Sequence, residues 1–180
     1  MAFRAKAKKL NADQLWDYAL KALGQRAYSA GEIRQKLMGR AETSADVTQT
    51  MLKLRDYGLT DDKKFSEAFA SSRLQNQGLG SFRVLRQLRA KRVAGPVAAN
   101  AVSTAYAGTS EAALIENFLS RKYRNTDLRE FLKQQKNVAS VYRRLRTAGF
   151  SSGSSLDALK RYTKSVEDWS EPPEEDADLS

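Results

Sequence analysis

RVLRQLRAKRV, at residues 83–93, occurs in three related forms along this chain of 180 residues. The other two copies are EIRQKLMGR at 32–40 and SVYRRLRTAGF at 140–150. Each copy holds two apolar residues four positions apart among basic ones, and these pairs are Ile33 and Leu37, Val84 and Leu88, and Val141 and Leu145. Side chains at this spacing share one face of an α-helix. The leucines of successive copies are 51 and 57 residues apart, which indicates a structural repeat of about fifty residues.

Apolar residues at helical spacing also precede and follow each copy, so each repeat is predicted to hold three helices. The patterns are Leu15, Ala19, Ala22, Leu23 and Val47, Met51, Leu54 around the first copy; Phe65, Ala68, Phe69 and Val97, Ala101, Ala105 around the second; and Leu114, Ile115, Phe118, Leu119 and Leu156, Leu159 around the third. A fifty-residue unit buries little surface alone, so neighbouring units are expected to share a core. The predicted fold is all-α, an elongated tandem array of three three-helix repeats.

The predicted organisation has five parts. A basic N-terminal arm covers 1–11, the repeats cover 12–59, 60–107 and 108–164, and an acidic tail covers 165–180. From Glu167 onward the tail has seven acids and no Lys or Arg, and it is expected to be disordered. NTDLREFLKQQK, at 125–136, lengthens the third repeat, and it either extends a helix or forms a loop.

Several helix boundaries are signalled locally. Ser29 and Glu32 form a predicted capping box, and Ser154 with Asp157 repeats that pattern. Gly58 stands where a glycine is expected to end a helix.

The stretch GLTDDKKFSEAF, at 58–69, contains two adjacent carboxylates, Asp61 and Asp62. They either take part in metal binding or catalysis, as in a carboxylate-dependent nuclease, or begin a helix. A metal site needs further ligands, and none is evident nearby. Thr60 or Asp61 can cap the helix, and both acids suit its positive end. We therefore interpret the pair as a helix start.

The composition restricts the chemistry. The chain has no Cys and no His, which excludes disulfides, thiolate or imidazole zinc sites, and Ser-His-Asp triads. We expect no enzymatic activity, no cofactor and no metal. MAFRAKAKKL has no apolar signal core, and no stretch is long and apolar enough to span a membrane. We expect a monomeric cytoplasmic protein.

The charge is strongly positive, with a net +10 and a pI near 9.9. Residues 1–166 carry all 31 Lys and Arg against 14 acids, which indicates a polyanionic partner or a protein that coats a polyanion. The candidate binding residues are the basic side chains of the three related segments: Arg34, Lys36, Arg83, Arg86, Arg89, Lys91, Arg92, Arg143, Arg144 and Arg146. The alternative is that these arginines form a solvated helix face. The aromatic residues Tyr28, Tyr57, Phe82, Tyr106 and Tyr142 are expected to pack between helices.

The wording and spacing of these segments resemble the RecX regulatory proteins of bacteria. The resemblance rests on RAYSAGEIRQKL (26–37), YGLTDDKKFSEAFASSR (57–73), GLGSFRVLRQLRAKRV (78–93) and RRLRTAGF, and it covers roughly residues 12–163. The Asp pair followed by Phe65 and Arg73 is its most specific part. The chain departs from the family at Lys91-Arg92, where Lys-Gly is frequent, and at 125–136.

The resemblance implies a tandem of three-helix repeats that modulates the RecA recombinase. Such proteins bind RecA and its filament on single-stranded DNA, and they restrain ATP hydrolysis, strand exchange and co-protease activity. Weak direct DNA binding is a further expectation. The alternative function is a helical DNA-binding protein or transcription regulator that acts on duplex DNA, although the basic helices contain few of the Asn and Gln residues that read adenine.

Overall fold

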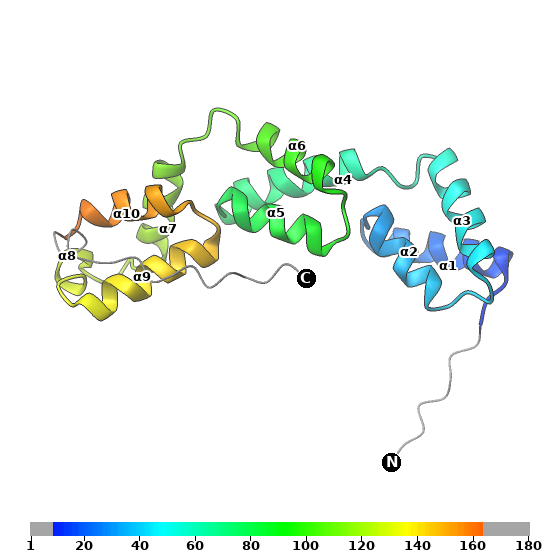
Figure 1. Ribbon diagram of the computed structural model, residues 1–180, viewed down its shortest axis with the longest axis horizontal. Helices are drawn as coiled ribbons and strands as arrows, with labels where there is room; N and C mark the ends of the chain where they lie inside the picture. The colour runs from blue at the N-terminus through cyan, green and yellow to red at the C-terminus, as the bar shows by residue number, and fades with distance from the viewer. Residues whose placement is uncertain (1–8, 164–180) are drawn as a thin grey trace, which may run out of the picture. The chain divides into compact units, whose positions relative to one another are not determined.

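The computed structural model describes residues 9–163, and all the regular elements in that range are helices (Figure 1). The predicted all-α class and the arrangement in three-helix repeats are confirmed. The described helices fall into two compact units, one made of residues 9–77 and 84–107 and the other of 78–83 and 108–163. The predicted repeat limits at 12–59, 60–107 and 108–164 stay a prediction. Residues 1–8 of the predicted basic arm (1–11) and the whole predicted acidic tail (165–180) lie outside the described residues.

The first unit begins with α1 (Ala12–Gln25), α2 (Ala30–Met38) and α3 (Ser44–Asp56). Their apolar faces close on one core, in which Leu15, Ala19, Ile33, Leu37, Val47 and Leu54 are fully or almost fully buried. The backbone of Leu10 pairs with the strand-like turn after α2, donating to Arg40 O at 2.8 Å and accepting from Glu42 N at 2.9 Å. This pairing fixes the chain entering α1 against the end of α2.

The same unit continues with α4 (Asp62–Ser72), the five-residue π-helical segment η1 (Arg73–Gln77), α5 (Ser81–Ala90) and α6 (Gly95–Tyr106). Helix α4 packs chiefly on α6. The buried residues at this contact are small, Ala70 on one side and Ala98 and Ala101 on the other. Small side chains allow two helix backbones to approach closely.

The second unit contains α7 (Glu111–Lys122), α8 (Leu128–Phe131), α9 (Gln135–Ala148) and α10 (Ser152–Lys160). Their shared core is larger than that of α1–α3 and includes Ile115, Leu119, Leu132, Val138, Val141, Leu145, Phe150 and Leu159. The stretch 125–136, left open by the sequence, forms turns around the single-turn α8, which Asp127 caps.

Most of the expected boundaries are present. The Ser29–Glu32 capping box begins α2, and Gly58 follows α3 with a left-handed φ of +67°. The box predicted at Ser154 is wrong, because α10 begins three residues earlier, with Ser151 accepting from the Ser154 N–H. Gly149 ends α9 and Ser151 caps α10, so the turn between the two helices is shorter than the sequence pattern suggested.

Candidate functional site

The two carboxylates of the Asp pair serve different helices. Asp61 caps its own helix, α4, by accepting from the Lys64 N–H at 3.0 Å. Asp62 reaches back to the first repeat and accepts from the Ala30 N–H, at the start of α2, at 2.7 Å. No group of three or more acidic side chains that could hold a metal occurs between residues 9 and 163. The geometry therefore supports the helix-start interpretation and adds a link between repeats that the sequence did not reveal.

Around Ala30 the start of α2 meets the end of α5. The Ser29 hydroxyl donates to the Lys91 carbonyl, and Gly31 lies so close to Arg92 that an added Cβ would collide with the Arg92 backbone and Cβ. The Lys91 ammonium donates to Glu32 Oε1 at 3.1 Å. We call this contact, made by Ser29–Glu32 with Asp62, Lys91 and Arg92, the repeat junction.

The repeat junction engages two of the ten candidate binding residues. Lys91 is partly buried, and its charge is paired with Glu32. Arg92 donates from Nε to Gln35 Oε1 at 2.8 Å. Both side chains therefore hold the first two repeats together, which is a structural role that the basic pattern of 83–93 did not distinguish from binding.

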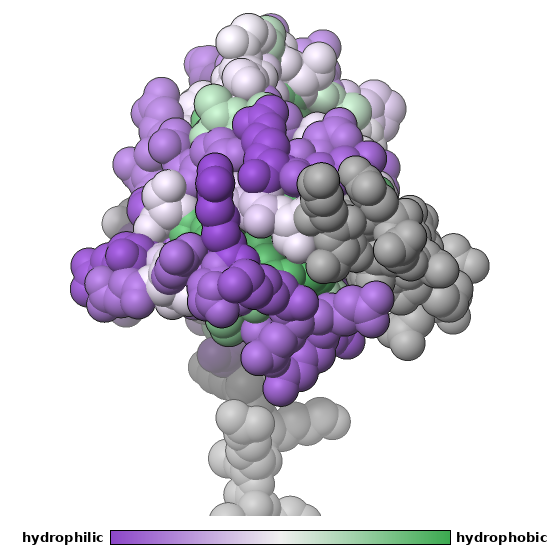
Figure 2. Space-filling view, turned by 90° about the vertical axis from the view of Figure 1, so that its left-hand side faces the viewer, coloured by the Kyte–Doolittle hydropathy of each residue, from purple (hydrophilic) through white to green (hydrophobic). Residues whose placement is uncertain are grey.

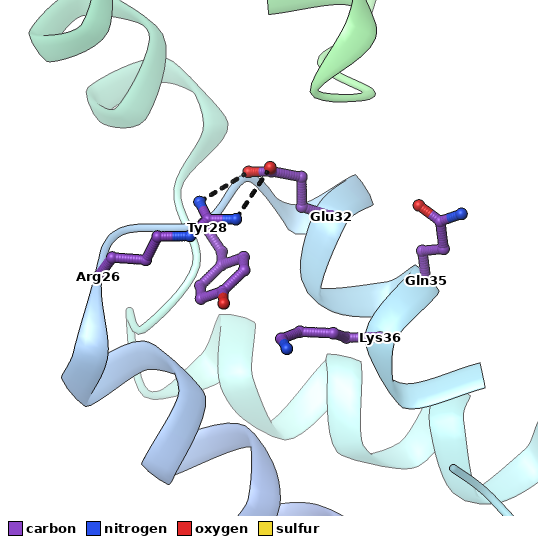
Figure 3. A pocket seen from close by; sticks show the side chains of 5 residues that line it. All are labelled: Arg26, Tyr28, Glu32, Gln35 and Lys36. Carbon is purple, nitrogen blue, oxygen red and sulfur yellow. Dashed lines mark hydrogen bonds and ion pairs between the residues drawn. The ribbon is translucent and has the colours of Figure 1, made fainter. Parts of the chain in front are cut away.

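Beside the junction lies a shallow pocket of about 270 Å³, shown in Figure 3. It is lined by Arg26, Tyr28, Glu32, Gln35 and Lys36. The Arg26 guanidinium lies 3.6 Å from the centre of the Tyr28 ring and donates to Glu32 Oε1 at 3.2 Å. The Lys36 ammonium lies 5.5 Å from the same ring. The aromatic ring thus holds two cations, one of which is already paired with a carboxylate.

Glu32 is the acid on which this cluster converges. Burial alone would raise the pKa of Glu32, but hydrogen bonds from Arg26, Lys91 and the Ser29 N–H outweigh burial and lower that pKa below its usual 4.5. Glu32 is therefore ionised at neutral pH and neutralises much of the surrounding positive charge. Arg26 and Lys91 are thus both paired with Glu32, whereas Lys36 keeps a positive charge at the pocket.

The remaining candidate residues separate into engaged and exposed groups. Arg83 donates to Thr147 O at 3.4 Å, Arg144 to the Tyr123 hydroxyl at 3.2 Å, and Arg146 to Phe150 O at 2.8 Å. By contrast, four side chains are exposed and form no hydrogen bond or ion pair within residues 9–163, and these are Arg34, Arg86, Arg89 and Arg143. The structure thus leaves four of the ten candidates fully available to a partner.

Two of the exposed arginines hold equivalent positions. Arg86 precedes the buried Leu88 by two residues on α5, and Arg143 precedes the buried Leu145 by two residues on α9. In the first repeat Gln35 stands at that position. Because the buried leucines fix the rotation of each helix, Arg86 and Arg143 project from corresponding sides of their helices.

The aromatic residues were predicted to pack inside, and two of them do not. Tyr57 is 68% exposed and Phe82 is 55% exposed, whereas Tyr142 is buried as expected. Tyr57 leans on Trp16, with ring centres 5.6 Å apart. Tyr57 comes directly before Gly58, at the end of α3. This place at a helix end is the feature of the sequence that could have indicated its exposure.

One face of the protein, seen from the side of α8, is mainly polar (Figure 2). Figure 2 views the protein from the side where α8 is labelled in Figure 1, and hydrophilic residues dominate its coloured area. Over residues 9–163, no helix has the length and apolar character needed to cross a bilayer.

Comparison with known proteins identifies the same segments. The family model described as RecX, second three-helix domain, matches residues 61–102. The Regulatory protein RecX of Chromohalobacter salexigens is 34% identical over 86 residues, which cover 48% of this chain and 56% of that protein. The match to Regulatory protein RecX of Chlorobium phaeobacteroides similarly spans 52% of the relative, so these alignments cover about half of each relative's length.

Other matches cover most of both chains. Regulatory protein RecX of Mannheimia succiniciproducens is 27% identical over 150 residues, covering 83% of this chain and 94% of that one. The crystal structure of RecX from Lactobacillus salivarius superposes with a TM-score of 0.66 at 17% identity, over 84% of this chain and 96% of that one. The structural match shows that the two proteins share a fold, and the sequence matches indicate the similarity to RecX proteins. The chain therefore carries a match to the second three-helix domain of RecX and is similar to RecX regulatory proteins over most of its length.

Proposed function

We propose that this protein regulates RecA by binding the recombinase and its filament on single-stranded DNA. The main effect would be inhibition of ATP hydrolysis, strand exchange and co-protease activity. The similarity to RecX regulatory proteins supports regulation in general. The binding model rests on two exposed arginine side chains that form no hydrogen bond or ion pair within residues 9–163, Arg86 and Arg143. They hold equivalent positions on α5 and α9, the helices that contain the second and third copies of the related segment.

The proposed mechanism is multivalent contact. One exposed arginine gains little from pairing with an acid in water, on the order of 1 kcal/mol or less. Several such contacts joined in one chain add up, because each contact raises the effective concentration of the next. A chain that touches neighbouring recombinase subunits would oppose the movements that accompany nucleotide turnover. The same side chains would also support weak, salt-dependent contact with DNA phosphates.

The first prediction concerns the double variant Arg86→Glu, Arg143→Glu. Binding to a RecA filament on oligo(dT), held with a non-hydrolysable ATP analogue, should weaken by roughly tenfold or more, because two contacts are lost and two repulsive charges are introduced. Fluorescence anisotropy of labelled protein measures the affinity. Thermal unfolding should be almost unchanged, since neither side chain is engaged in the fold.

The double variant Lys21→Glu, Arg55→Glu is a matched control with the same change in net charge on the exposed surfaces of α1 and α3. It should bind the filament nearly as the unaltered protein does. An equal loss of filament affinity in the two double variants would mean that net charge, and not the arginines of α5 and α9, determines binding. Tight binding to naked duplex DNA with no preference for the filament would favour the DNA-binding alternative.

A further inference from the structure

The charges of the second unit and of the acidic C-terminal segment are nearly equal and opposite. Residues 78–83 and 108–163 carry twelve Lys and Arg against five acids, a net charge of +7. Residues 164–180 carry seven acids and one lysine, a net charge of −6. The first unit, over 9–77 and 84–107, has fifteen basic residues against nine acids, a net charge of +6. Net charge therefore does not distinguish the two units, and the choice between them rests on where the charges lie and where the acidic segment is attached.

Within the second unit the positive charge is concentrated on α9. This helix has four basic residues, Lys136, Arg143, Arg144 and Arg146, and no acid in its fourteen positions. Arg146 donates a hydrogen bond to Phe150 O, and Arg144 donates one to the Tyr123 hydroxyl. Lys136 and Arg143 are exposed. They lie seven residues apart, which is two helical turns, and so project from the same side. The exposed side of α9 is therefore a basic strip without internal neutralisation.

The acidic segment is attached to the helix that packs against α9. It follows Thr163, just after α10, and α10 packs against α9. A helix of fourteen residues is about 21 Å long. Seventeen residues can extend over roughly 55 Å, so the segment is long enough to run along all of α9. Its acids begin at Glu167, three residues beyond the first residue of the segment.

We propose that residues 164–180 dock along the exposed side of α9 and compete there with polyanionic partners. The occupant is this acidic segment of the same chain, and the contact is made by its carboxylates with Lys136 and Arg143. Such docking would be strongest at low salt, because exposed charge pairs are screened as ionic strength rises. The docking itself is independent of the proposed function, whereas its effect on RecA rests on that function.

Zero-length carbodiimide cross-linking of the full-length protein tests the docking directly. This reaction joins a carboxylate to a lysine amine only when the two are in contact. At 20 mM salt, mass spectrometry should find the acids of 167–178 linked mainly to Lys136, and the yield should fall by at least half at about 0.5 M salt. Mixing isotopically heavy and light chains separates links within one chain from links between chains. Links spread equally over lysines of the first unit, such as Lys21 and Lys53, would overturn the proposal, as would a yield that does not depend on salt.

Two exposed arginines provide matched variants. Arg143→Glu removes an attractive charge and adds a repulsive one beside Lys136, so the yield at Lys136 should drop by about half or more. Arg34→Glu, on α2 of the first unit, makes the same charge change and should leave this yield unaltered. Equal effects of the two variants would contradict docking on α9.

The competitive role has its own readout. In full-length protein with all seven tail acids replaced by Asn or Gln, the affinity for oligo(dT) should rise by roughly tenfold at 50 mM salt and converge with that of the unaltered protein at high salt. The variant should also act on RecA ATP hydrolysis at lower concentration. Cross-links at Lys136 without any gain in affinity would leave the docking in place and refute the competition. Cross-links with no effect of the unaltered protein on RecA would refute only the proposed function.

Discussion

Arg92 has a backbone conformation that usually requires glycine. Its φ is +62°, in the left-handed region, and it ends α5 with Arg92 N donating to Arg89 O and Val93 N donating to Leu88 O. Gly149 ends α9 with the same two bonds, at the equivalent position after Leu145. The left-handed conformation costs a residue with a Cβ about 1 kcal/mol or more. Arg92, which stands where α9 has Gly149, is thus strained, and its bond to Gln35 offsets part of that strain.

Arg92→Gly should therefore raise the free energy of unfolding, by about 0.5–1 kcal/mol, even though it removes the bond to Gln35. Arg92→Ala is the control, because it removes the same side chain and keeps the strained Cβ, and it should lower stability. Urea unfolding followed by circular dichroism measures both. If both variants are destabilised equally, the guanidinium contact outweighs backbone strain.

The ionised Glu32 makes the repeat junction sensitive to acid. Its pKa is lower in the folded chain than in the unfolded chain, so its contribution to stability is present above the unfolded pKa of about 4.5 and is lost as pH falls through the folded pKa. We predict that the unaltered protein is more stable than Glu32→Gln at pH 6 and that this difference shrinks steadily below pH 4.5. Urea unfolding of both proteins from pH 6 to pH 3 measures the difference. A difference that stays constant or widens on acidification would contradict the ionic role of Glu32.

At the scale of helices, close backbone approach defines how repeats join. In the first unit Gly31, at the start of α2, lies against Arg92 beyond the end of α5. In the second unit Gly80, just before α5, lies against Gly149 at the end of α9, and Gly80 N donates to Ala148 O at 2.9 Å. Both close approaches place a glycine against the left-handed residue that ends a helix, Arg92 after α5 and Gly149 after α9.

Gly31→Ala should lower the free energy of unfolding by roughly 1–3 kcal/mol, since its Cβ would meet the Arg92 backbone, which can move only with the whole helix end. Gly24→Ala in α1 is the matched control. A Cβ at Gly24 meets nothing within 4 Å, so this change should stabilise α1 by about 0.5–1 kcal/mol. Thermal unfolding distinguishes the two variants, and equal effects would show that the repeat junction tolerates a side chain at Gly31.

The sequence predicted helices well because a helix is specified locally. The apolar pairs such as Ile33 and Leu37 are fully buried, and the Ser29 capping box forms as its residues suggest. The sequence did not predict which basic residues face inward. Lys91 and Arg86 look alike in the pattern of 83–93, but only Lys91 finds a carboxylate, and that carboxylate lies 59 residues away. Contacts of this kind depend on how repeats join, which periodicity does not encode.

The short helix α8 shows the same limit in another form. The stretch 125–136 has no clear period, and its structure depends on Asp127 capping a single turn and on Leu132 entering the core of the second unit. Ser154 illustrates the converse error, because two nearby serines offer the same capping chemistry and the pattern alone favoured the wrong one. Gly149 ends α9, and only two residues separate it from α10, so Ser151 and not Ser154 stands at the N-cap position.

At the scale of the whole molecule, excess positive charge is carried by both units, and exposed basic side chains stand on several helices of each. Six of the ten candidates hold the structure together, and four remain for a partner. A protein that binds through a few dispersed arginines should be salt-sensitive and should lose function gradually as they are replaced. This behaviour differs from that of an enzyme, in which one substitution can abolish activity.

ATP hydrolysis by RecA on single-stranded DNA, with this protein titrated in, tests the central claim most directly. A DNA-free reaction and a reaction with a single-stranded-DNA-binding protein serve as controls for background turnover and for simple competition. We predict inhibition at amounts well below one protein per RecA, because in the proposed mechanism one regulator would contact several subunits of a filament. Unchanged hydrolysis at a molar excess of this protein, under salt conditions where it binds naked DNA, would contradict the account.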